Sequence, residues 1–289
     1  MIGAVDDLPE LTFRTDAAEL ETLREELPAF IRETVAAAGA DGVVVLVSGG
    51  VDSVLTAALC VEALGADAVT ALVLPCTLAD AEEAIDAEST LEGLGVDPTT
   101  VQLQPLVGVF EDTVAPEIST ETDRLAVGNA VARLRMVVAY YAANATGRLV
   151  CGTLNRTELL FGYHTKHGAA AADLRPIAGL YKTEVRALAR HVDVPTAVVE
   201  RTPTAGLWTG QTDEAELGAP YGLLDVLLHE LVERDLGIAG AADSLGVDES
   251  LVARYAHRIV ENRHKREPAP SPNAEESGAA FFFELENRV

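Results

Sequence analysis

The stretch Val43-Val44-Val45-Leu46-Val47-Ser48-Gly49-Gly50-Val51-Asp52-Ser53 decides the fold class of this chain. Its first five residues are apolar and rich in valine, which is typical of a strand buried on both faces of a parallel sheet. From Leu55 to Leu64 the apolar residues recur at helical spacing. A strand, a glycine turn and a helix in this order place backbone N–H groups and a helix N-terminus at the carboxyl edge of the sheet, where anions bind.

The residue types of the turn indicate that the anion is a phosphate. Gly49 and Gly50 let the backbone approach a phosphate closely, and Ser48 and Ser53 add hydroxyl donors. Asp52 among these donors makes sense mainly if a magnesium ion joins it to the phosphates. The turn has neither the lysine of the P-loop nor the spacing of the dinucleotide fingerprint. A plain tight turn is the alternative interpretation. The hexapeptide resembles the pyrophosphate-binding loop of the ATP pyrophosphatases, which adenylate a substrate and release pyrophosphate.

The rest of the chain continues the alternation of strands and helices. Strands are predicted at 68–74, 100–103 and 149–151, and helices at 79–94, 106–114, 125–145, 180–191, 221–233 and 250–261. Near the N-terminus, a helix from Ala17 should end before Pro28, which would begin a second helix. This pattern predicts an α/β fold with a doubly wound, mostly parallel sheet and helices on both faces. Residues 1–267 are expected to form one domain, and 268–289 a loosely held tail.

The charge balance restricts the partners of the protein. The formal net charge is −25, from 46 acidic and 21 basic residues, which disfavours a nucleic-acid partner unless basic residues concentrate locally. Such a composition resembles that of proteins from salt-loving microbes, in which salt screens the repulsion. The chain has three lysines, Lys166, Lys182 and Lys265. In so lysine-poor a chain each of them is a poor candidate for ordinary surface solvation, so each is expected to contact a specific partner.

The sequence also predicts a cytoplasmic protein without a membrane partner. No stretch approaches the ~18 uncharged apolar residues of a membrane span, and the first residues lack the basic and apolar regions of a signal peptide. Cys60, Cys76 and Cys151 are far apart and in apolar settings, so we expect buried thiols and not ligands or disulfides.

Two further segments carry candidate site residues. After the strand at 149–151, the Thr153 hydroxyl could meet a nucleotide and Glu158 a magnesium ion, since both lie at a strand's carboxyl end. Asn155 with Glu158 three residues later also fits a helix N-cap, and this alternative stays open. On the helix at 125–145, Asn129 and Arg133 share a face, which could bind a ligand or be solvated.

Taken together, the motifs resemble those of the ammonia-dependent NAD synthetases from Leu46 to Arg266. They are SGGVDS at 48–53, GNAVARLRM at 128–136, GTLNRTE at 152–158, GYHTKHG at 162–168, D-x-x-P at 173–176, LYKT at 180–183, PTAGLW at 203–208, TDEAELG at 212–218 and HKR at 264–266. All three lysines fall inside these motifs. The resemblance implies an adenine-nucleotide-hydrolase-like sheet and a homodimer with the dinucleotide site near the subunit interface.

The resemblance also implies roles for individual residues. ATP would be held by Leu46, Val47, Ser48, Gly49, Gly50, Val51, Asp52, Ser53, Thr153, Lys182 and Thr204. Deamido-NAD would be held by Asn129, Arg133, Lys166, Asp173, His264 and Lys265. Asp52 and Glu158 would bind Mg²⁺, and Lys166, Lys182 and Asp173 would act in catalysis. We therefore expect Lys166, Lys182 and Glu158 to converge on one cleft at the sheet edge.

The implied reaction is the adenylation of a nicotinate carboxylate, followed by displacement of AMP by ammonia to give NAD. Relatives that use glutamine carry a further amidase domain, and only about 40 residues precede the first strand here, so free or transferred ammonia is the expected donor. One departure concerns Ala169, which occupies the position of an aspartate in the family's T-K-Y-G-D loop. That aspartate is a candidate for handling ammonium, and Glu158 or Asp173 could substitute for it.

Two other interpretations were considered. A tRNA-modifying enzyme of the same superfamily would need a catalytic cysteine pair and a basic RNA surface, and the sequence has neither. A nucleotide-binding regulator without catalysis is favoured by Ala169. It is disfavoured by two magnesium carboxylates on separate segments.

Overall fold

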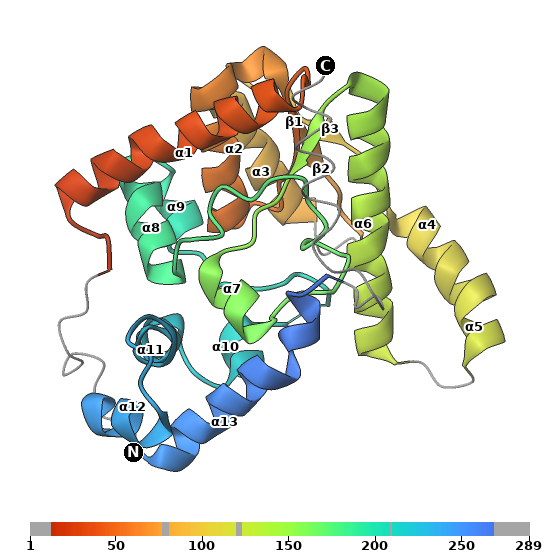
Figure 1. Cartoon of the computed structure of the whole chain (residues 1–289). Helices are drawn as coiled ribbons and strands as arrows, with labels where there is room; N and C mark the ends of the chain where they lie inside the picture. Colours follow the sequence, from red (N-terminus) through yellow and green to blue (C-terminus); the bar gives the residue numbers. More distant parts are fainter. Residues whose placement is uncertain (1–12, 77–80, 120–122, 209, 269–289) are drawn as a thin grey trace, which may run out of the picture.

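Four parallel strands form the centre of the structure (Figure 1). The computed structural model describes residues 13–76, 81–119, 123–208 and 210–268. The strands are β1 (Val43–Leu46), β2 (Val69–Val73), β3 (Thr99–Thr100) and β4 (Leu149–Cys151), in the order β3-β2-β1-β4. β1 pairs in parallel with β2 on one side and with β4 on the other. The prediction of a doubly wound, parallel α/β sheet is confirmed, because the chain runs outward from β1 in both directions.

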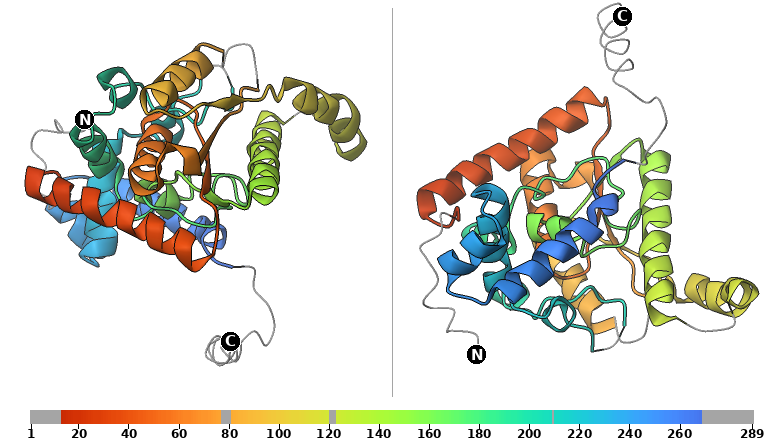
Figure 2. Two further views of the ribbon diagram at one scale, coloured as in Figure 1. Left: turned by 90° about the horizontal axis from the view of Figure 1, so that it is seen from above. Right: turned by 60° about the horizontal axis from the view of Figure 1, so that its bottom comes forward.

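Helices cover both faces of the sheet and form a further layer at its carboxyl edge (Figures 1 and 2). They are α1 (Ala17–Ala37), α2 (Val51–Leu64), α3 (Ala81–Gly93), α4 (Gln104–Val109), α5 (Ala115–Ile118), α6 (Arg124–Thr146), α7 (Arg156–Phe161), α8 (Lys182–His191), α9 (Thr196–Val199), α10 (Asp213–Leu217), α11 (Tyr221–Leu228), α12 (Ile238–Leu245) and α13 (Glu249–Glu261). Short 3₁₀ or π-helical turns are η2 (Ala66–Ala68), η4 (Phe110–Val114), η5 (His229–Glu233) and η6 (Arg263–Lys265). Within the described residues, no helix is long and apolar enough to cross a bilayer.

The strands are buried on both faces because alternate residues enter two different cores. Val43 and Val45 of β1 pack in one core with residues of α1, α2 and α8, whereas Val44 packs on the other face with Val150 and residues of α6. This explains why the strand is a continuous apolar run rather than an alternating pattern. A third core joins α7, α11, α12 and α13.

Helix α1 corrects the prediction of a break at Pro28. The helix is continuous with Pro28 inside it, and Asp16 caps its N-terminus by accepting hydrogen bonds from the N–H groups of Ala18 and Glu19. A proline within a helix costs about 3 kcal/mol. The helix packs along α2 and α8 and buries, besides Pro28 itself, the four side chains Leu20, Leu23, Ile31 and Val35. Burial of each such side chain contributes roughly 1.5–3 kcal/mol, so packing outweighs the proline.

Other differences from the predicted elements are local. The strand predicted at 100–103 is only the two residues of β3, and α9, α10 and α12 were not predicted as helices. The tail predicted at 268–289 lies outside the described residues except for Pro268.

Candidate active site

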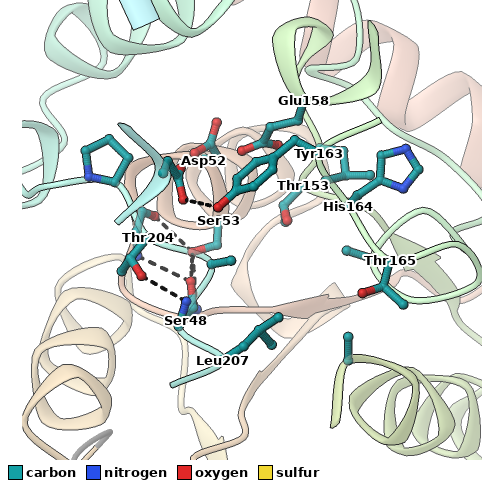
Figure 3. Close-up of a pocket in the computed structure, with 18 of the residues that line it drawn as sticks. Ser48, Asp52, Ser53, Thr153, Glu158, Tyr163, His164, Thr165, Thr204 and Leu207 are labelled. Atoms are coloured by element: carbon teal, nitrogen blue, oxygen red, sulfur yellow. Dashed lines mark hydrogen bonds between the residues drawn. The ribbon is translucent and has the colours of Figure 1, made fainter. Parts of the chain in front are cut away.

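A cavity of about 1040 Å³ opens at the carboxyl edge of the sheet, where the segments that follow β1 and β4 diverge (Figure 3). In an open parallel sheet this point, at which the strand order reverses, is where ligands bind. Ser48, Asp52 and Ser53 come from the β1 side, Thr153 and Glu158 from the β4 side, and all five line the cavity. The structure therefore brings these residues of the predicted anion site to one cavity at the carboxyl edge of the sheet.

Hydrogen bonds within the loop after β1 hold its shape. Gly49 has a φ of +82°, a conformation that favours glycine, and Gly50 is the N-cap residue of α2. The Ser53 hydroxyl donates to the Gly50 carbonyl at 2.9 Å and accepts from the Ser48 N–H at 3.2 Å. The loop thus presents the N-terminus of α2 to the cavity, as an anion site requires.

Lys182 lies at the bottom of the cavity between two carboxylates. Its side chain is 4 % exposed, and its Nζ forms an ion pair with Asp52 and lies 3.9 Å from Glu158 Oε1. Burial alone would lower the pKa of Lys182, but Asp52 and Glu158 outweigh it and raise that pKa. Burial, together with the charge of Asp52, raises the pKa of Glu158 to about 8. Three distant segments of the chain therefore meet as one buried ionic group.

Glu158 forms the helix cap that the sequence left open as one of two interpretations, and its predicted magnesium role stays a prediction. Asn155 accepts a hydrogen bond from the Glu158 N–H at 2.9 Å, and Glu158 Oε2 accepts from the Asn155 N–H at 3.2 Å, which is a capping box at the start of α7. The other carboxylate oxygen, Oε1, faces Lys182. Asn155 also donates from its side chain to Asp52 Oδ1 at 2.8 Å. The helix cap thus orients both candidate metal carboxylates.

Asp52 and Glu158 fit a magnesium ion by the chemistry of their environment. Two carboxylates share one buried ammonium group, and burial, followed by the charge of Asp52, raises the pKa of Glu158. Among the described residues, no three His, Cys, Asp or Glu side chains form a metal site of their own. Mg²⁺ commonly takes one or two carboxylates and completes its shell with phosphate oxygens and water.

Residues that the sequence analysis did not single out complete this part of the cavity. Tyr163 donates to Asp213 Oδ1 at 3.0 Å, and Tyr221 donates to Asp213 Oδ2 at 2.8 Å. Asp213 is buried, and burial raises its pKa despite these hydrogen bonds. The Tyr221 ring centroid lies 5.0 Å from Lys182 Nζ. Asp213 and Tyr163 lie within motifs of the resemblance, but no spacing in the sequence relates them to Lys182.

Most of the predicted nucleotide residues line the cavity. These are Leu46, Val47, Ser48, Gly50, Val51, Asp52, Ser53, Thr153, Thr204 and Lys182, together with Asn129 and Lys265 from the predicted dinucleotide set. Gly49 is not a lining residue, because its small backbone is covered by Arg201 and by the backbone of α3 at Glu83. On α6 the lining arginine is Arg135 and not the predicted Arg133.

The structure does not bring Lys166 to the cavity with Lys182 and Glu158, so the expected convergence of all three is wrong for Lys166. Among the described lining residues, Arg133, Lys166 and His264 are absent, yet these three lie together: Arg133 Nε donates to the Lys166 carbonyl at 3.2 Å, and Lys166 Nζ donates to the His264 carbonyl at 2.6 Å. The reason is that the loop at 162–168 folds against the η6 turn, which directs the lysine toward a backbone carbonyl.

Asp173 also lies outside this cavity. Its Oδ2 accepts from the Val150 N–H at 2.7 Å and its Oδ1 accepts from the Tyr140 hydroxyl at 3.1 Å. Through its two carboxylate oxygens, Asp173 therefore connects the segment that follows the loop at 162–168 to β4 and to α6. Its predicted role toward a substrate remains a prediction.

His164 and Ala169 line the cavity, and Figure 3 shows His164 on the same side of it as Thr165. Both ring nitrogens of His164 are buried without a hydrogen-bond partner. Burial, with help from the charges of Lys265, Arg175 and Arg266, lowers the pKa of His164 to about 4. The imidazole of His164 is therefore neutral near pH 7. It lines the same cavity as Ala169, the position at which the resemblance implies an aspartate.

Comparisons with known proteins place this chain in a family. Residues 23–269 match the family model described as NAD synthase. An NH₃-dependent NAD⁺ synthetase of Halobacterium salinarum is 42 % identical over 271 residues, which cover 94 % of this chain and 100 % of that protein. Among solved structures, an NH₃-dependent NAD synthetase of Campylobacter jejuni in complex with nitrate has a TM-score of 0.74 at 28 % identity, covering 88 % of this chain and 99 % of that chain. The NMN synthetase of Francisella tularensis has a TM-score of 0.73 at 31 % identity, covering 88 % and 98 %.

Proposed function

The chain belongs to the NAD synthase family, and we propose that it is an ammonia-dependent ligase that converts deamido-NAD to NAD with ATP. The observation that supports this most strongly is the meeting of Asp52, Glu158 and Lys182 at the switch point of the sheet. These groups can gather a triphosphate and a magnesium ion at one place.

In the first half of the reaction, the nicotinate carboxylate attacks the α-phosphorus of ATP and displaces pyrophosphate, which gives an acyl-adenylate. The loop at 48–53 would hold the phosphates with its N–H and hydroxyl groups, and Lys182 would neutralise charge that develops on them. The mechanism requires no nucleophile from the protein. Catalysis therefore consists of alignment and charge stabilisation.

We propose that Asp52 and Glu158 hold the magnesium ion, which would neutralise phosphate charge as a Lewis acid. Asn155 would then orient both ligands, since it donates to Asp52 and caps the segment that carries Glu158. Lys182 would remain beside the ion and keep the pair of carboxylates charged.

In the second half, ammonia attacks the acyl carbon and AMP leaves with the adenylate oxygen. The two residues expected to substitute for an aspartate at position 169 differ in their position relative to the cavity. Glu158 lines the cavity, whereas Asp173 does not. We therefore propose that the nucleophile is free ammonia, which needs no protein base before it attacks, because Glu158 is already assigned to the magnesium ion.

We further propose that the dinucleotide lies near the interface of a homodimer. Arg133, Val137 and Tyr141 are spaced by four residues on one face of α6, and the apolar two are 64 % and 75 % exposed. Helices α4 and α5 project beside α6 (Figure 2) and carry further exposed apolar side chains, including Val109 and Ile118. Sedimentation velocity on the chain and on Tyr141→Glu tests this proposal, which predicts a dimer and a monomer respectively.

The surroundings of the enzyme are also proposals. The net charge of −25 and the scarcity of lysine favour a salt-rich cytoplasm, in which the ionic strength screens self-repulsion. Residues 1–267 would form the catalytic domain, and this range contains all the proposed site residues.

The experiment that tests the function is an incubation with ATP, Mg²⁺, ammonium and deamido-NAD. The proposal predicts AMP, pyrophosphate and NAD in equal amounts, and loss of all three in Asp52→Asn. A parallel reaction with nicotinic acid mononucleotide determines which substrate is preferred, since one structural neighbour is named for the mononucleotide product. Formation of AMP without NAD, or no reaction of the wild-type chain with deamido-NAD, would refute it.

A further inference from the structure

Arg201 lies against the phosphate loop at 48–53. It follows α9 and precedes Thr204 by three residues, so one short segment carries both a guanidinium and a proposed ATP hydroxyl. Its side chain is 25 % exposed and lines the cavity. Nη1 donates to the Gly49 carbonyl at 3.4 Å, and Nη2 pairs with Asp86 Oδ2 of α3 at 2.5 Å.

The contact with Gly49 is close enough to depend on glycine. A Cβ on Gly49 would lie 3.0 Å from Arg201 Nη1 and 3.1 Å from the Glu83 carbonyl oxygen. The guanidinium therefore lies directly on the backbone of the loop that is proposed to hold the phosphates. A guanidinium in this place can reach a phosphate on the loop by a rotation of its own side chain.

The loop that is proposed to bind the triphosphate has too little positive charge of its own, and a guanidinium would supply it. The loop at 48–53 contains no basic residue, and the charge of Lys182 is already opposed by Asp52 and Glu158. The triphosphate of ATP carries several negative charges, and the planar fork of arginine matches two phosphate oxygens at once. Arg201 is thus a cation, within the part of the chain that the structure describes, that contacts the loop itself.

The present partner of Arg201 is easily exchanged. Asp86 is 58 % exposed, and ion pairs at exposed positions contribute about 0–1 kcal/mol, because water solvates both charges well. A phosphate group in a partly enclosed cavity is a stronger competitor for the guanidinium than an exposed carboxylate.

We propose that Arg201 is an ATP ligand that leaves Asp86 to bind the β- and γ-phosphates and that then holds the pyrophosphate product. This inference rests on the proposed function, to which it adds a substrate-binding residue. The competing explanation is that Arg201 only braces the loop by bridging Gly49 and Asp86.

Two variants separate these explanations, namely Arg201→Met and its matched control Asp86→Asn. Isothermal titration calorimetry would measure the binding of Mg²⁺-ATP, AMP and inorganic pyrophosphate to each full-length variant. A phosphate ligand predicts that Arg201→Met weakens binding of ATP and pyrophosphate at least tenfold and of AMP less than twofold. Asp86→Asn should bind ATP as tightly as the wild type or more tightly, because its arginine is free. Arg201→Lys, which keeps the charge but loses the fork, should fall between.

Equal losses in Arg201→Met and Asp86→Asn would overturn the proposal in favour of the brace, as would parallel losses of ATP and AMP binding. Unchanged ATP binding in Arg201→Met would overturn it as well. Should Arg201→Met not fold, Arg201→Lys and Asp86→Asn give the same contrast. Because the titrations need no deamido-NAD, they remain decisive even if the wild-type chain makes no NAD.

Discussion

Replacement of Lys182 by methionine should destabilise the folded chain strongly, because it leaves two carboxylates without their cation. Lys182 is 4 % exposed, and its Nζ is shared by Asp52 and Glu158, which are themselves 16 % and 14 % exposed. Removal of one partner from a buried ionic group costs about 3–5 kcal/mol, since the remaining charge is neither solvated nor paired. At about 2–4 °C per kcal/mol for a domain of this size, the midpoint of thermal unfolding should fall by roughly 10 °C.

Urea denaturation of the wild type and of Lys182→Met measures this difference in stability. Both proteins are unfolded at pH 7.5 in the presence of a chelator, and circular dichroism monitors the unfolding. The matched control is Lys166→Met. Lys166 is partly exposed and donates one hydrogen bond to a carbonyl, so its loss should cost about 1 kcal/mol. The double variant Asp52→Asn/Lys182→Met removes one of the two charges and should recover part of the lost stability.

The pH dependence supplies a second test of the same reasoning. The folded-state pKa of Glu158, about 8, is above its ordinary value, so the folded state binds a proton that the unfolded state releases, and stability falls as pH rises through this window. Without Lys182 the pKa of this carboxyl should rise further. The deficit of Lys182→Met should therefore shrink as the pH is lowered from about 10 toward 8, and it should stay constant below pH 8, where Glu158 is protonated in both folded proteins. A variant within 1 kcal/mol of the wild type at pH 7.5, or a deficit that grows as the pH falls from about 10 toward 8, would refute the assignment of a buried ionic group.

Three further predictions follow from other parts of the molecule. Because the folded-state pKa of His164 is about 4, below its ordinary value, stability should be lost as the pH falls from 6.5 toward 4, by roughly 3 kcal/mol at about 1.4 kcal/mol per unit. His164→Phe should lack this part of the acid limb in urea titrations, and an identical limb in both proteins would contradict the prediction. Ala169→Asp should raise ammonia-dependent turnover, measured as kcat/KM for ammonium, and an unchanged or lower value would count against a role for that position. Raising KCl from 0.1 M to 1 M, which shortens the Debye length from about 10 Å to about 3 Å, should increase the unfolding midpoint, and a midpoint independent of salt would argue against self-repulsion at a net charge of −25.

The sheet and the phosphate loop could be predicted from the sequence because their signals are local. Five apolar residues followed by SGGVDS specify a buried strand, a turn and a helix within about twenty residues. The capping box of Asn155 and Glu158 is likewise encoded in four residues. Helices α9 and α10 have only 4 and 5 residues, too few to show a helical period.

The side chains that complete the cavity could not be predicted in the same way, because tertiary contacts decide where they lie. Arg133 and Arg135 both belong to one motif, and only the packing of α6 on β1 and β4 determines that Arg135 enters the cavity. Lys166 was expected beside Lys182, but the fold of its loop against η6 takes it to the His264 carbonyl. Arg201 belongs to none of the sequence motifs. Its position is determined by the tertiary contact between α3 and the phosphate loop.

The two carboxylate oxygens of Glu158 have different partners, so a substitution of Glu158 can remove two interactions at once. One oxygen secures the first turn of α7 and the other serves the ionic group, so truncation to alanine would damage architecture and chemistry at once. Glutamine retains an acceptor for the Asn155 N–H while it removes the charge. A comparison of the alanine and glutamine forms would therefore divide the total defect into a scaffolding share and an electrostatic share, which neither form reveals by itself.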